Sequence, residues 1–243
     1  FTPLLEGFRT VPFNDIDAVK AAVTPATVAI MLELVQGEGG INIAKKEYVL
    51  QLRRLCDEKN LLLIIDEVQT GIGRTGEMFA FKHYGIIPDV MILAKSLGGG
   101  LPIGVMVAKK EIADILKPGM HASTFGGSPL VCKAALGVFA AIAKEKMLKN
   151  AKLMGEYAIK KLEGLKAEFP CVKEVRGLGL MIAVELTIDG KPIFEECFKN
   201  GLIINCTQGN VLRIMPALNV TKKQVNTAFA ILRESLKKAV AKI

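Results

Sequence analysis

The sequence has no tryptophan, only two histidines, and no apolar stretch near the roughly 20 residues that a membrane-spanning helix needs. We therefore predict no contact with a membrane. The five cysteines form no CxxC pair, so with so few histidines no zinc-binding pattern exists and no metal site is expected. An odd, scattered set of cysteines is typical of reduced thiols and indicates a cytoplasmic protein. These cysteines are Cys56, Cys132, Cys171, Cys197 and Cys206.

The sequence also lacks an initiator methionine and a signal peptide, because Phe1 opens a segment with neither a basic start nor a long apolar core. We interpret the chain as a fragment or a processed form of a longer protein. The net charge of +8 lies largely in helix-like stretches where aromatic residues are not interleaved with the basic ones. This pattern favours a solvated helix face over nucleic-acid binding, although the charge can attract anionic substrates.

The first part of the chain alternates between strand-like and helix-like patterns. A helical pattern at residues 44–56 separates two apolar runs, which predicts a βαβ unit. We therefore predict an α/β fold with a mostly parallel sheet flanked by helices, and assign residues 1–149 to one large domain. The expected strands are residues 9–13, 28–35, 61–65, 90–94 and 103–108.

The pattern changes near residue 150, where we place the domain boundary. A connecting helix and a small α+β domain are predicted for residues 150–243. Thr221 and Gln224 form a capping box that predicts the start of the last helix. The other expected elements are helices at residues 129–145, 150–169 and 192–201, one or two strands within 172–186, and a hairpin of 202–206 with 211–215.

Asp66 and Lys95 each follow a continuous apolar run, at residues 61–65 and 90–94. Such runs are typical of strands buried on both faces of a parallel sheet. Ligands of these sheets bind outside the carboxyl ends of the strands, so both side chains are offered to the same crevice. The alternative for Lys95 is a solvated loop lysine. The paired Asp66 and the three glycines at 98–100 favour a functional role.

A carboxylate and an amine in one crevice suit a particular chemistry. A carboxylate that faces a ring nitrogen keeps it protonated, by on the order of 4 kcal/mol at 4 Å with an effective dielectric of 20. A nearby lysine can form a Schiff base with an aldehyde. Pyridoxal 5'-phosphate (PLP) requires both groups as well as phosphate donors. Ser123 and Thr124, in a segment that precedes a helix start, are the candidate donors.

Four segments together resemble the class III PLP-dependent aminotransferases: residues 32–40, 65–76, 94–100 and 121–129. The resemblance runs along essentially the whole chain in the expected order and spacing. It implies the fold type I of PLP-dependent transferases, with part of the large domain and a C-terminal α+β small domain. Within the family, residues 201–220 are most similar to the branch that acts on N2-acetyl-L-ornithine in arginine biosynthesis.

The resemblance implies a role for each matching residue. Lys95 and Asp66 are the catalytic pair: Lys95 binds the cofactor aldehyde covalently and then moves the proton, and Asp66 pairs with the pyridine nitrogen. Gln69 bonds the phenolic oxygen of the ring, and Val68 packs on the ring face. Glu67 belongs to the same cofactor-binding motif, with a structural ion pair as its alternative role.

The same resemblance implies a homodimer with shared active sites. Thr124 contacts the cofactor phosphate of the neighbouring subunit, and Ser123 lies near the bound acetylornithine. Glu38 and Arg213 resemble a gate pair, in which the arginine takes one carboxylate of 2-oxoglutarate or glutamate and the glutamate neutralises it otherwise. The competing interpretation of Arg213 is a surface ion pair.

Other family features are absent from this sequence. The phosphate-binding glycine/serine-rich loop, the aromatic residue that stacks on the ring and the arginine for the substrate α-carboxylate belong to the first third of the family, before Phe1. We therefore expect the 243-residue chain alone to bind PLP weakly or not at all, and to turn over no substrate.

Three alternatives remain open. Another class III aminotransferase, acting on ornithine, 4-aminobutyrate or succinylornithine, shares the same cofactor residues. A truncated, non-catalytic module could serve as a scaffold. A nucleotide-driven ATPase is suggested by residues 61–67, an apolar strand followed by two acidic residues, but a P-loop is lacking and Lys95 would be unexplained.

Overall fold

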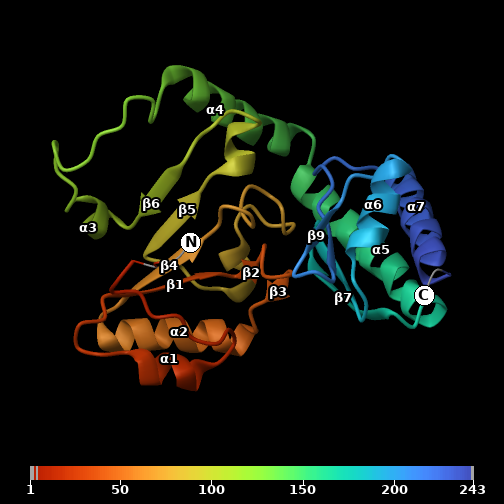
Figure 1. Cartoon of the computed structure of the whole chain (residues 1–243). Helices are drawn as coiled ribbons and strands as arrows, with labels where there is room; N and C mark the ends of the chain where they lie inside the picture. The colour runs from red at the N-terminus through yellow and green to blue at the C-terminus, as the bar shows by residue number, and fades with distance from the viewer. Residues whose placement is uncertain (1–2, 4, 242–243) are drawn as a thin grey trace.

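The computed structural model describes residues 3 and 5–241, so the outer ends of the two predicted domains, residues 1, 2, 4, 242 and 243, lie outside the described residues. Its first sheet has the strand order β1-β4-β5-β6 (Figure 1). The pairs β1–β4 and β4–β5 are parallel, while β6 runs antiparallel to β5. The predicted mostly parallel α/β sheet is therefore confirmed. The strands are β1 (Ala29–Glu33), β4 (Leu62–Asp66), β5 (Val90–Leu93) and β6 (Val105–Ala108).

Helices cover both faces of this sheet. Helices α1 and α2 pack on one face, where Leu52 joins Leu63 and Ile65 in a buried cluster (Figure 1). Helix α4 packs on the other face against η2, and Ile142 lies there in a cluster with Leu93. The helices are α1 (Ile16–Ala22), α2 (Lys46–Lys59), η1 (Ala80–Tyr84), η2 (Lys95–Gly98), α3 (Lys110–Ala113) and α4 (Pro129–Lys144).

A second sheet is antiparallel, with the order β7-β8-β10-β9, and α5, α6 and α7 lie beside it (Figure 1). Its core includes Leu165, Leu212 and Leu236, all fully buried. The predicted capping box of Thr221 and Gln224 is present at the start of α7. The elements are α5 (Met147–Glu168), β7 (Val172–Leu178), β8 (Met181–Leu186), α6 (Lys191–Lys199), β9 (Asn205–Thr207), β10 (Val211–Ile214) and α7 (Lys222–Val240).

One predicted strand is wrong, and the sequence analysis did not predict helices α1 and α3. Residues 9–13 form no strand, because they are mostly solvent-exposed and Pro12 has no N–H to donate to a ladder. Helix α1 follows directly, and Asp15 caps it by accepting a hydrogen bond from the Ala18 amide at 2.9 Å. A short two-stranded hairpin, β2 (Val35–Gln36) with β3 (Asn42–Ile43), also continues from the predicted strand 28–35.

Arg74 joins the two sheets. Its Nη1 atom donates to the carbonyl oxygens of Leu180, at 3.3 Å, and Pro216, at 2.5 Å. Burial of the guanidinium lowers the pKa of Arg74 below its usual value. The Arg74 side chain therefore supplies hydrogen-bond donors to two backbone carbonyl groups where the two sheets meet.

Asp89 fixes the start of β5. Its Oδ2 accepts from the Leu63 amide at 2.7 Å and from Arg53 at 2.8 Å, and its Oδ1 lies 2.7 Å from Lys109 Nζ. Burial acts to raise the pKa of Asp89, but the hydrogen bonds from Leu63, Lys109 and Arg53 outweigh it and hold the pKa below the usual value. The ionised carboxylate is thus the form that the fold stabilises.

We expect Asp89→Asn to lower the free energy of unfolding by about 2 kcal/mol at pH 7, because a nearly buried charge-assisted network is lost. The folded-state pKa is lowered, so this contribution is complete above the unfolded pKa of about 4 and is lost as pH falls through the folded value. Urea unfolding at pH 7 and at pH 3 measures both effects.

The matched control is Asp57→Asn, since Asp57 also pairs with Arg53 but is 63% exposed. Its expected effect is below about 0.5 kcal/mol at either pH. Equal effects of the two substitutions would contradict the assigned role of Asp89.

The described residues contain no helix that is both long and apolar enough to cross a membrane.

Candidate active site

Asp66 and Lys95 lie at the same edge of the first sheet. Asp66 is the last residue of β4, and it pairs with Ile92 of the adjacent parallel strand β5. Lys95 begins η2, separated from the end of β5 by Ala94 alone, and has a φ of 45°, which is uncommon for a residue other than glycine. The prediction that both side chains follow neighbouring parallel strands is confirmed.

Both groups are available to a ligand. The Oδ1 atom of Asp66 accepts from the Val68 amide at 2.8 Å, and no hydrogen bond to its Oδ2 is found among the described residues. Lys95 is exposed, and no ion pair of its amine occurs within residues 3 and 5–241. Val68 and Gln69 follow in the same turn and are half-buried.

Glu33 brings a second carboxylate to this edge, which the sequence analysis missed. It is the last residue of β1 and pairs in register with Asp66. Its Oε2 accepts from the Gly37 amide at 3.0 Å, and burial, followed by the nearby charge of Asp66, raises the pKa of Glu33. The predicted strand extended to Val35 and therefore placed Glu33 inside a strand, whereas the structure ends β1 at that residue.

Glu38, in the loop between β2 and β3, and Arg213, in β10, form an ion pair. Arg213 Nη1 lies 2.9 Å from Glu38 Oε1 and 3.5 Å from Gln69 Oε1. Its Nε donates to Asn205 Oδ1 at 2.9 Å. The Arg213 side chain is only 10% exposed, whereas that of Glu38 is 69% exposed. A nearly buried arginine thus reaches the turn that contains Gln69, while its carboxylate partner can move into solvent.

Glu67 lies away from this edge. It is 1% exposed, and its carboxylate accepts from the Thr70 hydroxyl and from the Phe81 amide. Burial raises the pKa of Glu67. The alternative of a structural ion pair is not observed among the described residues, where hydrogen bonds take its place.

Ser123 and Thr124 are exposed in the long connection between α3 and α4, at the outer edge of the molecule (Figure 1). Ser123 Oγ accepts from the Gly126 amide at 3.0 Å. Among the described residues, neither hydroxyl is hydrogen-bonded to Asp66, Gln69 or Lys95. The structure therefore brings together Asp66, Lys95, Gln69, Glu38 and Arg213, but not these two residues.

The sequence that carries these strand-end groups matches a known family. The model of the class III aminotransferases matches residues 7–236. The chain belongs to the class III aminotransferase family.

The relatives belong to the same family, but their names refer to two different amino donors. The chain is 52% identical to an acetylornithine aminotransferase of Methanocaldococcus jannaschii over 96% of the chain and 59% of the relative. It is 40% identical to ornithine aminotransferase 1 of Staphylococcus aureus, over 98% of the chain and 60% of the relative. The chain thus spans about three fifths of the length of these relatives.

A solved structure supports the same fold. The ornithine aminotransferase of Toxoplasma gondii superposes with a TM-score of 0.95 at 35% identity, over 100% of this chain and 58% of that one. That structure is described as having partial occupancy of PLP at its active site. The fold type I architecture predicted from the sequence is therefore confirmed.

Family membership implies PLP as the cofactor, and the strand-end groups fit it in part. Asp66 offers a carboxylate and Lys95 an amine, neither of them in an ion pair among residues 3 and 5–241, and Gln69 offers an amide in the turn that follows Asp66. These are the groups that a pyridinium nitrogen, an aldehyde and a phenolic oxygen require.

Proposed function

We propose that this chain is the PLP-binding and C-terminal part of a transaminase. The observation that supports this most strongly is the placement of Asp66 and Lys95 at the ends of adjacent parallel strands, with no ion pair to either side chain among the described residues. When bound, PLP supplies an electron sink for the negative charge that develops on a substrate carbon. Such a sink needs an anion at the ring nitrogen and a base at the carbon.

The residues of this chain divide those tasks. The Asp66 carboxylate would keep a proton on the ring nitrogen, Gln69 would orient the ring oxygen and Val68 would pack against the ring. Lys95 Nζ would hold the aldehyde and, once the donor amine has displaced it, would carry the proton as a general base. The carboxylate of Glu67 has no proposed ligand contact, because its hydrogen bonds to Thr70 and Phe81 hold it inside the fold.

The proposed reaction moves an amino group from N2-acetyl-L-ornithine to 2-oxoglutarate, giving glutamate, as a step of arginine biosynthesis. Arg213 would bind one carboxylate of 2-oxoglutarate and Glu38 would replace that carboxylate when it leaves. Their ion pair and the burial of Arg213 support this exchange. Relatives named acetylornithine aminotransferase support N2-acetyl-L-ornithine as the amino donor. Ornithine is the second candidate, because other relatives are named ornithine aminotransferase.

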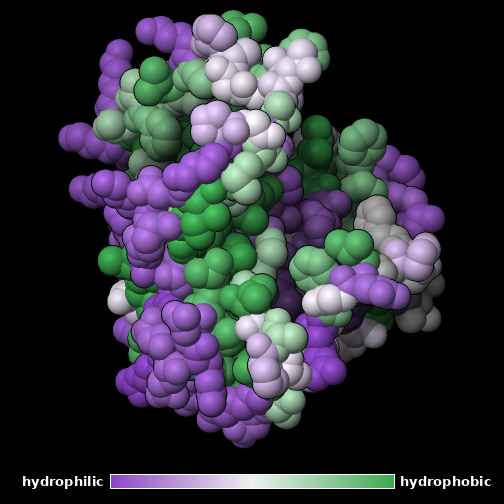
Figure 2. Space-filling view, turned by 90° about the vertical axis from the view of Figure 1, so that its left-hand side faces the viewer, coloured by the Kyte–Doolittle hydropathy of each residue, from purple (hydrophilic) through white to green (hydrophobic). Residues whose placement is uncertain are grey.

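We also propose a homodimer in which Ser123 and Thr124 serve the partner's substrate and cofactor phosphate. Their exposure supports this, as does the band of hydrophobic surface on the side of the molecule shown in Figure 2. Exposed hydrophobic residues on nearby elements include Met106, Val107, Met120, Phe125 and Leu130. Large exposed apolar surfaces mark association sites.

Two further parts of the proposal concern organisation and location. The separate sheets and cores support a boundary near residue 150, between the C-terminal part of the large PLP-binding domain (1–149) and the connecting helix with the C-terminal small domain (150–243). A cytoplasmic location is supported by the five cysteines, all of which are free thiols.

A donor panel tests this function. We expect no transamination by the 243-residue chain alone, because it spans only about three fifths of its relatives. A chimaera that adds the unmatched part of the Methanocaldococcus relative should transfer the amino group to 2-oxoglutarate. The donors to compare are N2-acetylornithine, ornithine, 4-aminobutyrate and succinylornithine, with kcat/KM highest for the first.

The matched control is the same chimaera with Lys95→Ala, which should be inactive with every donor. Full turnover by the chain alone would contradict the expectation that it holds only part of the active site. Preference for another donor would contradict the assignment of N2-acetylornithine as the substrate. ATP hydrolysis that survives Lys95→Ala would instead favour the ATPase alternative.

A further inference from the structure

The loop of residues 37–41, which we call the Glu38 loop, connects β2 to β3 and is held from outside the active site. The Glu38 carbonyl oxygen accepts from Thr207 Oγ1 at 2.7 Å and from Gln208 Nε2 at 2.9 Å. Both donors belong to the β9–β10 hairpin of the second sheet. The backbone of this loop is therefore attached to the same hairpin that carries Arg213.

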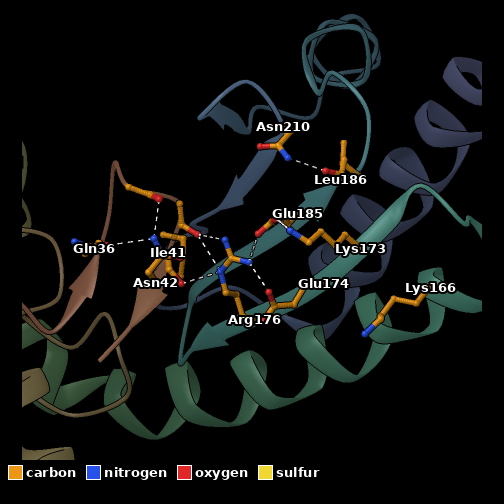
Figure 3. Close-up of polar contacts among 12 residues, drawn as sticks. Gln36, Ile41, Asn42, Lys166, Lys173, Glu174, Arg176, Glu185, Leu186 and Asn210 are labelled. Carbon is orange, nitrogen blue, oxygen red and sulfur yellow. Dashed lines mark hydrogen bonds and ion pairs between the residues drawn. The ribbon is translucent and has the colours of Figure 1, made fainter. Parts of the chain in front are cut away.

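Arg176 of β7 makes the most extensive attachment (Figure 3). Its Nε donates to the carbonyl oxygens of Gly40, at 3.1 Å, and Ile41, at 3.2 Å, and its Nη2 donates to Gly40 at 2.7 Å. Its Nη1 is bound by Glu174 and Glu185. Because the guanidinium is planar and its side chain is 13% exposed, the two carboxylates orient it so that its other donors face the loop.

The Glu38 loop does not hold its shape by intrinsic preference. Ile41 has a φ of 58°, a region that β-branched residues rarely occupy. It is fully buried in a cluster with Val35, Met181 and Val211. Such backbone strain persists only where the surroundings impose it, and Arg176 bonds the carbonyl of this same residue.

The other side of the loop faces the active site. The Gly37 amide donates to Glu33, and a Cβ atom built at Gly37 would lie only 2.4 Å from Gln69 Nε2. Gln69 and Glu38 are in turn the two neighbours of the Arg213 Nη1 atom. A displacement of the loop would therefore change the surroundings of Arg213.

We propose that Arg176 is a positioning residue that fixes the Glu38 loop so that Glu38 stays on Arg213. Arg176 thereby sets how strongly an incoming dicarboxylate must compete with the Glu38 carboxylate for Arg213. The identity of this ligand rests on the proposed function, whereas the attachment of the loop does not.

Amide hydrogen exchange of the 243-residue chain, followed by NMR, tests the attachment. The probe is the Ile41 amide, which donates to the Gln36 carbonyl at 2.8 Å. Arg176→Lys keeps the charge but loses the planar fork, so we expect this amide to exchange about tenfold faster. Unchanged exchange would overturn the proposal.

The matched control is Lys173→Ala, because Lys173 binds Glu185 in the same network and, within the described part of the chain, makes no hydrogen bond to the loop. It should leave the Ile41 amide unchanged, and an equal effect would mean that general loosening of β7 explains the result. Thr207→Val, which removes one bond to the Glu38 carbonyl, is the milder second variant should Arg176→Lys fail to fold. It should increase exchange in the loop in the same direction.

The competition between a dicarboxylate and Glu38 for Arg213 is tested by calorimetry, with glutarate as the dicarboxylate. Glu38→Gln should tighten binding by about two- to fivefold, the range expected for losing an exposed competing carboxylate. Arg176→Lys should give a similar increase, and the double variant should bind no tighter than Glu38→Gln alone. Additive effects, or weaker binding in Arg176→Lys, would overturn the proposal.

Failure of the proposed function can be told apart from failure of this inference. If glutarate binds neither the unsubstituted chain nor the Glu38→Gln variant, the assignment of Arg213 as the site for a substrate carboxylate is wrong. The exchange of the Ile41 amide then decides alone whether Arg176 positions the loop.

Discussion

Borohydride reduction of the chain in excess PLP should attach the cofactor to Lys95 above every other lysine, and Lys95→Arg should abolish that label. The reason is geometric: Lys95 lies at the end of β5 with a positive φ, beside the carboxylate at the end of β4. Peptide mapping by mass spectrometry measures the label at each lysine. Excess cofactor is needed because the chain is expected to bind PLP weakly.

Two further variants make this test specific. Asp66→Asn should reduce the label at Lys95 by roughly tenfold, since a neutral amide replaces a charge-assisted bond to the ring nitrogen. Lys110→Arg, at the start of α3, alters a lysine outside the site and should leave the label at Lys95 unchanged. Dominant labelling at any lysine other than Lys95 would refute the assigned chemistry.

Gly155→Ala should destabilise the fold by about 3 kcal/mol, because α5 touches the β7–β8 turn at this residue. A Cβ atom at Gly155 would lie 2.1 Å from the carbonyl oxygen of Gly179, and backbone cannot yield as a flexible side chain can. Gly179 in turn packs against Thr75 of the first sheet's long loop. The added methyl would therefore push apart the junction that Arg74 also joins. Urea unfolding measures the loss.

Gly164→Ala, in the same helix, is the matched control with the opposite sign. Gly164 is exposed, and a Cβ atom there would have no neighbour within 4 Å. Replacing it should stabilise the chain by about 0.5–1 kcal/mol, because glycine loses more conformational freedom on folding than alanine. Similar effects at both positions would show that helix propensity, and not the close approach to Gly179, governs the response.

Most strands and helices could be predicted because their signals are local. Continuous apolar runs mark β4 and β5, proline after Ser128 marks the start of α4, and the capping box at Thr221 marks α7. The prediction failed at residues 9–13, where a few apolar residues in an exposed segment imitate a strand. Helix α1 had a signal that was overlooked, since Asp15 is a typical N-cap.

The candidate site was predictable to the extent that residues of one motif share one strand end. Asp66 and Lys95 follow from the rule that parallel strands present their carboxyl ends together. Glu33 was missed because the end of β1 depends on where the β2–β3 hairpin begins. Glu67 was grouped with its neighbours in sequence, yet its hydrogen bonds to Thr70 and Phe81 direct it into the fold.

The amino-acid sequence accounts for the class of fold and the pair of groups at its strand ends, since periodicity and strand direction are local properties. The attachment of the Glu38 loop to Arg176, and the contact of Arg213 with Gln69, arise only when two separate sheets pack together. No local pattern encodes them, because each joins segments far apart in the chain whose approach depends on the whole core. Folding thus places a carboxylate and a lysine at the same edge of the first sheet.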